Sequence, residues 1–248
     1  MKTKEICYWC GKPATSREHV PPKCLFPENK DIQKIYDESF RNNLITVPSC
    51  DKHNLQKSHD DEYLMTCLSG RIGNNGVSYI HTLTKVARSV ERNPKIIKTI
   101  GDDVLTIAGK EFPVSWVVTD NNRLIYSFES IARALYFHEN KEIFIGKCII
   151  VSDLFIQLED DKNSKSIIKD CKLIEAEKSS WKTKVVGENP RIFTYQFSNE
   201  DAFGCLSLIL TFYEKTKVYV VLAKDNSPNR EKHQTELLHL SKIFFEID

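Results

Sequence analysis

Two pairs of side chains in the first quarter of the chain have the spacing of metal ligands. Cys7 and Cys10 are separated by two residues, and so are Cys50 and His53. A gap of this size in a tight turn lets both members of a pair point at one ion. Three thiolates and one imidazole would make a closed tetrahedral zinc site, which has no open position for water and is therefore structural.

The remaining cysteines leave other interpretations open. Free cysteine is often simply buried, so the two pairs could be unrelated core thiols. Cys24 and Cys67 are near enough in sequence to replace one ligand. Cys148, Cys171 and Cys205 fall in apolar or charged segments, and we interpret them as non-functional.

A second polar set lies between and directly after these pairs. Glu18 and His19 are adjacent, with Pro21 and Pro22 close behind, and Asn54 follows His53. A neutral imidazole that titrates near pH 7 suits a general base. A lone histidine is more often a hydrogen-bonded polar residue than a catalyst. The neighbouring acid and the position between the metal pairs make His19 a stronger candidate for catalysis.

These residues together resemble the HNH endonuclease family. The segments that carry the resemblance are Cys7-x-x-Cys10, Glu18-His19-Val20-Pro21, Asn43-Leu44 and Cys50-x-x-His53-Asn54. Val47 to Asn54, followed by Asp61-Glu62, is similar to a sub-group of small bacterial members. The match covers about residues 5–65, a quarter of the chain. His53 stands where the family usually has a fourth cysteine, and Asn54 where many members have a final histidine.

The resemblance implies a ββα unit that hydrolyses DNA phosphodiester bonds. It makes His19 the general base and makes Glu18 and Asn54 the oxygen ligands of a catalytic Mg²⁺ or Mn²⁺. Asn43, or its neighbour Asn42, would hold the loop that orients His19. Stand-alone bacterial members of this size often occur in defence or mobile-element settings.

Residues just beyond the motif could add to this site. His59, Asp61 and Glu62 could each supply an extra ligand or orient one. Asp60, Asp61 and Glu62 could equally form an acidic first helical turn, which is favourable beside the positive end of the helix dipole.

Composition limits the remaining possibilities. The formal net charge of the 248 residues is +1, so polyanion binding must come from a local patch. Residues 1–57 carry ten Lys/Arg and seven Asp/Glu, a mild surplus of three. We expect no signal peptide and no membrane span, and eight cysteines without an export signal favour a reducing, cytoplasmic setting.

Hydrophobic spacing predicts the elements that follow the motif. Helices are expected over 60–68, 78–93 and 123–138, and a helix or loop over 159–172. Strands are expected over 104–119 (two, around Gly109 and Pro113), 143–151, 193–197, 205–212 and 217–222, the last two as a hairpin. On the helix over 78–93, Lys85, Arg88 and Arg92 form either a solvated face or a phosphate-contacting one.

The expected fold class is α+β. An HNH module with a structural zinc is predicted for residues 1–68, and a larger α+β domain with an antiparallel sheet for 69–248. The larger domain would clamp DNA, bind a protein partner or a second copy, or regulate the nuclease.

Three functions fit the sequence. The favoured one is a metal-dependent HNH endonuclease. The alternatives are a zinc-stapled module that binds nucleic acid or protein without cleavage, and a disused catalytic module attached to an active domain in residues 70–248.

Overall fold

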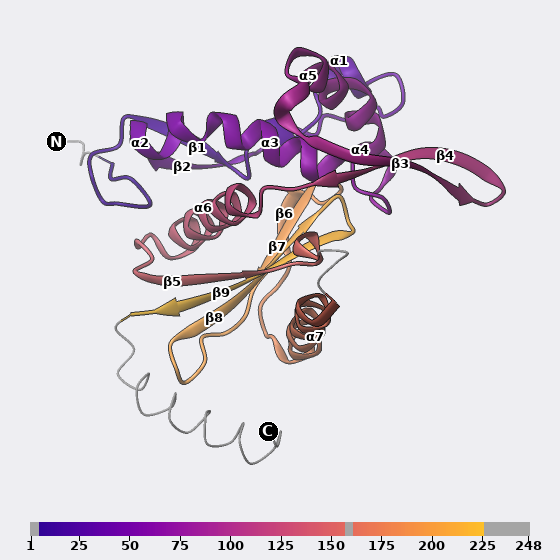
Figure 1. The fold of residues 1–248 in the computed structure, drawn as a ribbon. Coiled ribbons are helices and arrows are strands. Elements are labelled where there is room, and N and C mark those ends of the chain that lie inside the picture. The colour runs from indigo at the N-terminus through magenta and orange to yellow at the C-terminus, as the bar shows by residue number, and fades with distance from the viewer. Residues whose placement is uncertain (1–4, 157–160, 226–248) are drawn as a thin grey trace. The chain divides into compact units, whose positions relative to one another are not determined.

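The computed structural model describes residues 5–156 and 161–225, and within that range the side chains of Gln56, Ser58, His59, Ile107, Phe112 and Asp161 lie outside the description. The chain is an α+β protein whose sheets contain antiparallel pairs (Figure 1). It divides into two compact units. Unit 1 comprises Met1–Ile143, Gly187–Thr194 and Thr211–Lys217, and unit 2 comprises Phe144–Val186, Tyr195–Leu210 and Val218–Asp248. The predicted domain boundary after residue 68 remains a prediction.

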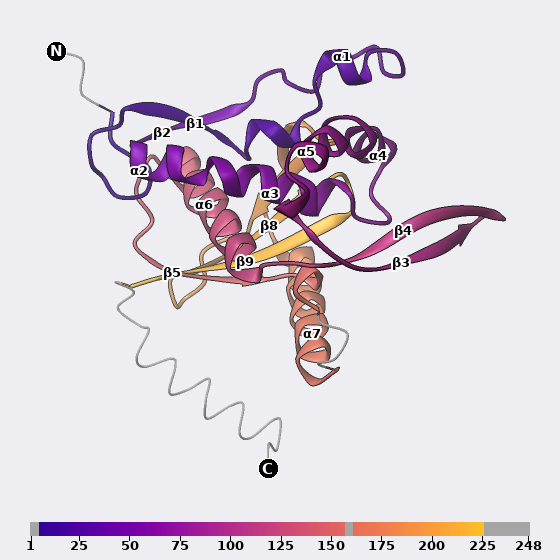
Figure 2. The ribbon, with the colours of Figure 1, turned by 45° about the horizontal axis from the view of Figure 1, so that its top comes forward.

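Unit 1 begins with a ββα arrangement. Strands β1 (Ser16–Val20) and β2 (Ile45–Ser49) pair antiparallel, with Glu18 opposite Val47 and His19 opposite Thr46. Helix α2 (Asp51–Asn54), a 3-10 turn (Leu55–Lys57) and α3 (Ser58–Ser69) follow, and Figures 1 and 2 both show this run beside the hairpin. The helix predicted over 60–68 is confirmed. The long β1–β2 connection contains a 3-10 turn (Lys23–Leu25) and α1 (Asn29–Ile32).

The helix predicted over 78–93 is also confirmed. It consists of α4 (Gly76–His81), a π-helical turn (Thr82–Val86) and α5 (Ala87–Arg92). The Asn75 side chain caps it by accepting from the Ser78 amide. Its three basic side chains all pair with carboxylates: Lys85 with Glu28, Arg88 with Asp31 and Arg92 with Glu62.

Helix α6 (Asn121–Asn140) is the longest helix in unit 1. The Asp120 side chain accepts from the Asn122 and Arg123 amides at its start, and Lys141 ends it in the left-handed conformation, with φ 59°. Its buried residues recur at helical spacing and confirm the helix predicted over 123–138. It packs against β2 and α3, and its Phe128 contacts Phe212.

A two-stranded ribbon precedes α6. A 3-10 turn (Pro94–Ile96) leads into β3 (Lys98–Ile107), which pairs with β4 (Lys110–Val118) around Ala108 and Gly109. Both strands are longer than predicted, and Pro113 lies within β4 opposite Val104 instead of beside the turn. Proline in a strand is tolerated where the strand has an open edge.

A five-stranded sheet has the order β5-β9-β8-β7-β6. Its strands are β5 (Gly146–Val151), β6 (Val186–Asn189), β7 (Phe193–Phe197), β8 (Cys205–Phe212) and β9 (Thr216–Lys224). The strands predicted over 143–151, 193–197, 205–212 and 217–222 are thereby confirmed, and β5 pairs antiparallel with β9.

Among the described residues of unit 2 is a long helix. Helix α7 (Asp161–Glu177) confirms the helical alternative for 159–172 within the described range, and Glu175 on it accepts from the Tyr219 hydroxyl of β9 at 2.9 Å. Two 3-10 turns flank α7, Asp153–Phe155 and Lys178–Ser180. Across the described part of the chain, none of the helices has both the length and the apolar character that a membrane crossing needs.

Candidate metal centre and polar cavity

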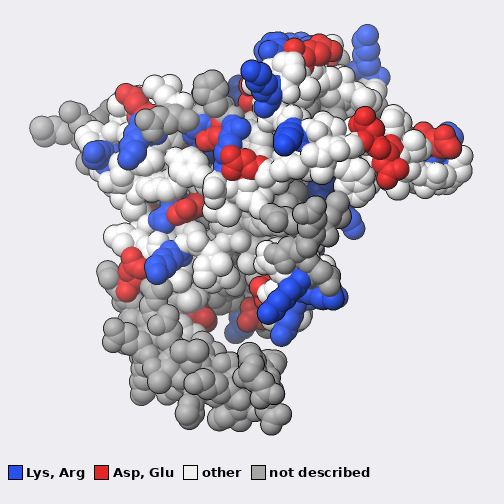
Figure 3. Space-filling model, in the orientation of Figure 1, with Lys and Arg blue, Asp and Glu red and all other residues white. Residues whose placement is uncertain are grey.

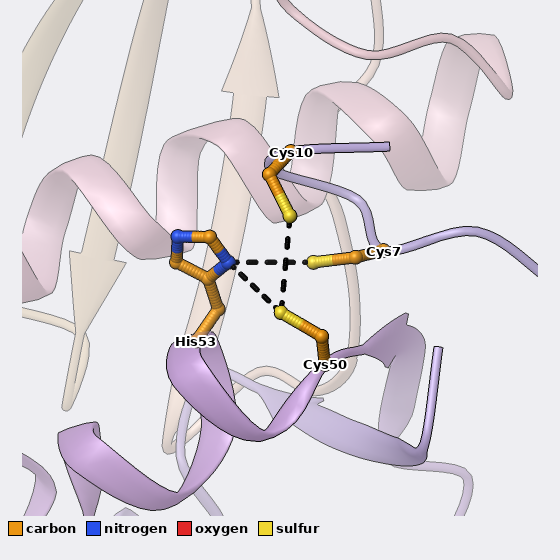
Figure 4. Close-up of side chains that lie close together, drawn as sticks. All are labelled: Cys7, Cys10, Cys50 and His53. Carbon is orange, nitrogen blue, oxygen red and sulfur yellow. Dashed lines mark hydrogen bonds between the residues drawn. The ribbon is translucent and has the colours of Figure 1, made fainter. Parts of the chain in front are cut away.

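Cys7, Cys10, Cys50 and His53 converge, as their spacing predicts. Their ligand atoms all lie within 4.8 Å of one another, and Figure 4 shows the three sulfurs and His53 Nδ1 turned inward. His53 Nδ1 is 3.5 Å from Cys7 Sγ and 3.3 Å from Cys50 Sγ, and Cys10 Sγ is 3.8 Å from Cys50 Sγ. Neighbouring donors of a tetrahedral zinc ion lie about 3.6–3.8 Å apart. The cluster therefore has the donor set and the spacing of a zinc site.

Local backbone geometry explains this convergence. The Gly11 amide donates to the Cys7 carbonyl at 3.0 Å and closes a tight turn that brings Cys10 beside Cys7. Gly11 has a φ of +71°, a conformation that side chains rarely adopt. On the other loop, Cys50 is the N-cap of α2, so the first helical turn places His53 on the same side.

The protonation states of His53 and Cys7 suit a metal, whereas burial raises the pKa of Cys10. Burial and the charge of Lys52 lower the pKa of His53, which keeps the imidazole neutral and able to coordinate. Burial raises the pKa of Cys7, but backbone amides of Cys10 and Trp9 outweigh it, so the net pKa is lowered toward the thiolate. Cys24 and Cys67 lie outside the cluster.

An aromatic stack ties the cluster to α6. The Trp9 ring is parallel to the His53 ring. It also contacts Tyr126, with centroids 5.6 Å apart, and Arg133, whose guanidinium carbon is 5.1 Å from the Trp9 ring centre. Tyr126 and Arg133 both belong to α6. The stack holds the imidazole in one orientation, with Nδ1 toward the sulfurs.

A polar cavity of about 340 Å³ lies in unit 1 beside this cluster's loops. Its lining comes from β1, the following turn, helices α2 and α3, and the π-helical turn Thr82–Val86. The lining residues are Arg17, Glu18, His19, Pro22, Lys23, Cys24, Asn54, Asp61, Glu62, Met65 and Lys85. Three of the predicted catalytic residues, Glu18, His19 and Asn54, therefore share one cavity.

Strand β1 gives Glu18 and His19 different environments. Successive side chains of a strand point to opposite faces. Glu18 belongs to the inner face and is 5% exposed, whereas His19 is half-buried. Burial, reinforced by the charges of Lys23 and Arg41, lowers the pKa of His19, so the ring is neutral at pH 7.

Sequence reasoning missed Lys57, the cation beside Glu18. Its ammonium is fully buried, makes an ion pair with Glu18 Oε1, and lies 3.8 Å from Asp61 Oδ1. Burial alone would lower the pKa of Lys57, but the charges of Glu18 and Asp61 outweigh it and raise the pKa. The one available signal was its position, three residues after Asn54 and four before Asp61.

The other predicted oxygen ligands differ in what they contact. Asn54 Nδ2 donates to Ser16 Oγ at 2.7 Å, which leaves the amide oxygen for a cation. Burial raises the pKa of Asp61 to about 6, although Lys57 opposes the shift. Glu62 Oε1 accepts from the Ser89 hydroxyl and from Arg92 at 3.0 Å, so one oxygen of this carboxylate is already bound.

Asn43 lies away from the cavity. Asn43 is exposed, adopts a left-handed conformation with φ 51° two residues before β2, and is not part of the cavity lining. The neighbouring Asn42 carbonyl accepts from Asn189 Nδ2 at 2.9 Å, so the Asn42–Asn43 turn is held in place. His59 belongs to α3, but its side chain lies outside the described part of the structure.

Basic side chains reach the cavity at three points. Arg17 and Lys85 have acidic partners, Glu5 at 2.7 Å and Glu28 at 3.4 Å, whereas exposed Lys23 has no ion pair with any residue the structure describes. On the face shown in Figure 3, acidic and basic side chains are interspersed instead of forming a continuous basic surface. A polyanion would therefore meet a local basic rim, in line with the net charge of +1.

No protein-family model, no curated protein and no solved structure matches the chain. The residues of the two sites are therefore the basis for inferring function.

Proposed function

We propose that this chain is a metal-dependent HNH-type endonuclease that hydrolyses DNA phosphodiester bonds. The observation that carries the proposal is the shared cavity, where Glu18, His19 and Asn54 meet although they come from β1 and α2. The antiparallel β1–β2 pair followed by α2 and α3 agrees with the ββα unit that the resemblance implies.

The residues present fit a hard divalent cation. Glu18 Oε2 is buried without a hydrogen-bond partner among the described residues, and the Asn54 amide oxygen faces away from the bond that its nitrogen makes. Mg²⁺ and Mn²⁺ prefer such oxygen donors. When bound, the ion supplies Lewis acidity at the scissile phosphate and stabilises the leaving 3′-oxygen.

His19 performs the proton transfer in this proposal. Its lowered pKa keeps the ring neutral, so one ring nitrogen accepts the proton of the attacking water. Lys23 and Arg17 at the rim attract the DNA backbone and position it over His19. The Cys7, Cys10, Cys50 and His53 cluster would hold a structural zinc that joins the loop before β1 to the start of α2.

The experiment is plasmid nicking with Mn²⁺ by the full chain and its His19→Ala variant. Loss of the general base should lower the rate by about 10²- to 10⁴-fold. His138→Ala is the control, because His138 lies in the last turn of α6 and does not line the cavity. Nicking by His19→Ala at the wild-type rate would contradict the role of His19.

A second candidate function is favoured by Lys57. Its ammonium already neutralises part of the Glu18 charge, as expected of a module that binds nucleic acid or protein without a catalytic metal. This alternative predicts a protein that contains zinc and binds duplex DNA, yet shows no Mn²⁺-dependent nicking at any enzyme concentration.

A further inference from the structure

Two of the carboxylates that line the cavity share one buried cation. Glu18 and Asp61 approach the same ammonium, that of Lys57, and the three groups together carry a charge of −1 when ionised. They come from β1, the turn before α3, and α3 itself. A net buried charge is costly unless a counter-ion or further hydrogen bonds compensate it.

Two carboxylate oxygens of this group lack hydrogen-bond partners. Glu18 Oε2 and Asp61 Oδ1 are both buried, and neither has a hydrogen bond to a residue in the described part of the chain. The buried Tyr8 hydroxyl is near enough for the Glu18 charge, after burial, to raise the pKa of Tyr8, but it makes no hydrogen bond of ordinary geometry there. Buried oxygens normally have partners, so both need a further cationic or donor group.

Resting on the proposed function, we infer that Asp61 is a third oxygen ligand of the divalent cation, beside Glu18 and Asn54, and that the Lys57 ammonium occupies the place of that cation in its absence. The motif residues supply only one carboxylate. Asp61 adds the second, and Lys57 accounts for how buried Glu18 and partly buried Asp61 keep their charges in the absence of the ion.

Glu62 provides a matched comparison for Asp61. The two carboxylates are adjacent in α3, and both line the cavity. Glu62 is held by Ser89 and Arg92 from the helix that ends at Arg92, whereas the orphaned oxygen of Asp61 lies beside Lys57. Asp61 therefore has a buried oxygen without a hydrogen-bond partner among the described residues, whereas the Glu62 carboxylate is already anchored through Oε1 to Ser89 and Arg92.

The test measures Mn²⁺ binding by the full chain through the loss of the free-ion electron paramagnetic resonance signal, without DNA. Asp61→Asn should weaken binding by at least about tenfold, since the negative charge that attracts the cation is lost and only a neutral amide oxygen remains. Glu62→Gln should bind as the wild type does. Lys57→Met should bind more tightly, by about tenfold, because a buried positive charge no longer repels the ion. Lys57→Arg keeps the charge and should not show that gain.

Circular dichroism confirms that each variant is folded, and if Lys57→Met is not, Lys57→Gln replaces it. Equal affinity of Asp61→Asn and wild type, or an equal loss in Glu62→Gln, overturns the ligand role of Asp61. Unchanged or weaker binding by the folded Lys57 variant that lacks the charge overturns the placeholder role of Lys57.

The two proposals can fail separately. Asp61-dependent Mn²⁺ binding in a protein that never nicks DNA supports this inference and contradicts the proposed function. If the wild-type protein nicks DNA but its Asp61→Asn variant keeps full Mn²⁺ affinity, the proposed function is supported and this inference is contradicted. A wild-type chain that binds no Mn²⁺ contradicts both.

Discussion

The indole of Trp9 lies flat against the imidazole of His53, with ring centroids 5.1 Å apart and an angle of 4° between the planes. Trp9 sits inside the Cys7–Cys10 turn, so one loop of the metal cluster braces the ligand supplied by the other. The same indole contacts Tyr126 of α6. The orientation of His53 is therefore fixed by packing as well as by its place in α2.

Removing this brace should loosen the cluster. We expect Trp9→Ala to lower the free energy of unfolding by about 2 kcal/mol, since a half-buried indole and an aromatic stack are lost. It should also release zinc at a lower chelator concentration. Trp116→Ala is the control: that indole is 49% exposed on β4, and the change should stay within about 0.5 kcal/mol. Urea melts and a chelator titration measure both effects, and equal effects of the two variants would contradict the brace.

Zinc content tests the cluster itself. The purified chain should contain about one zinc ion, bound by three cysteines and one histidine. Cys50→Ser removes a ligand but leaves a residue that can cap α2, so we expect loss of zinc and, through it, of cooperative unfolding. Cys148→Ser, on β5, should keep the full zinc content. Atomic absorption measures the metal, and retention of zinc by Cys50→Ser would show that another residue completes the site.

The rim lysine should appear in the salt dependence of DNA binding. Lys23→Ala should weaken binding to a short duplex and reduce the slope of log affinity against log salt by about 1, because one phosphate contact is lost. Lys110→Ala, at the exposed start of β4, should leave the slope unchanged. Fluorescence anisotropy without added Mn²⁺ provides the measurement. An unchanged slope for Lys23→Ala would place the DNA elsewhere.

His81 should make the fold sensitive to mild acid. Burial lowers the pKa of His81 to about 4, although a hydrogen bond from Nε2 to the Cys24 carbonyl at 3.0 Å opposes the shift. The unfolded chain takes up this proton below about pH 6.5, so stability falls as the pH drops from there toward 4. Between about pH 7 and pH 5, the wild type should lose about 2 kcal/mol more than His81→Gln. Urea melts of both proteins at the two pH values measure the loss of stability. An equal loss in the wild type and the variant would show that His81 does not cause the acid sensitivity.

Residue spacing predicted much of the metal cluster and of α6. Ligand pairs separated by two residues point at one ion when each pair lies in a tight turn, so their spacing predicts the cluster. The apolar residues of α6 recur at helical spacing over many turns, so the helix is predicted in spite of its polar ends. The β1–β2 pair could be anticipated only from the family resemblance. Both strands are short and mixed in polarity, and a long connection separates them, so neither alternation nor turn signals mark a hairpin.

Lys57 and the division into units were beyond sequence reasoning for a physical reason. A lysine within a polar run is normally exposed, and its burial here depends on Glu18, which lies 39 residues away in the chain. Unit 1 likewise includes Gly187–Thr194 and Thr211–Lys217. Such long-range contacts leave no periodic trace in the local sequence.

Because Gly187–Thr194 and Thr211–Lys217 belong to unit 1, this unit is complete only after both segments have been synthesised. The Tyr213 hydroxyl donates to the Leu25 carbonyl at 2.8 Å, and the Thr216 hydroxyl donates to Asn74 Oδ1 at the same distance. A ribosome has therefore translated as far as Thr216 before Leu25 and Asn74 obtain these partners. The early part of unit 1 stays incomplete until residues around 217 have emerged.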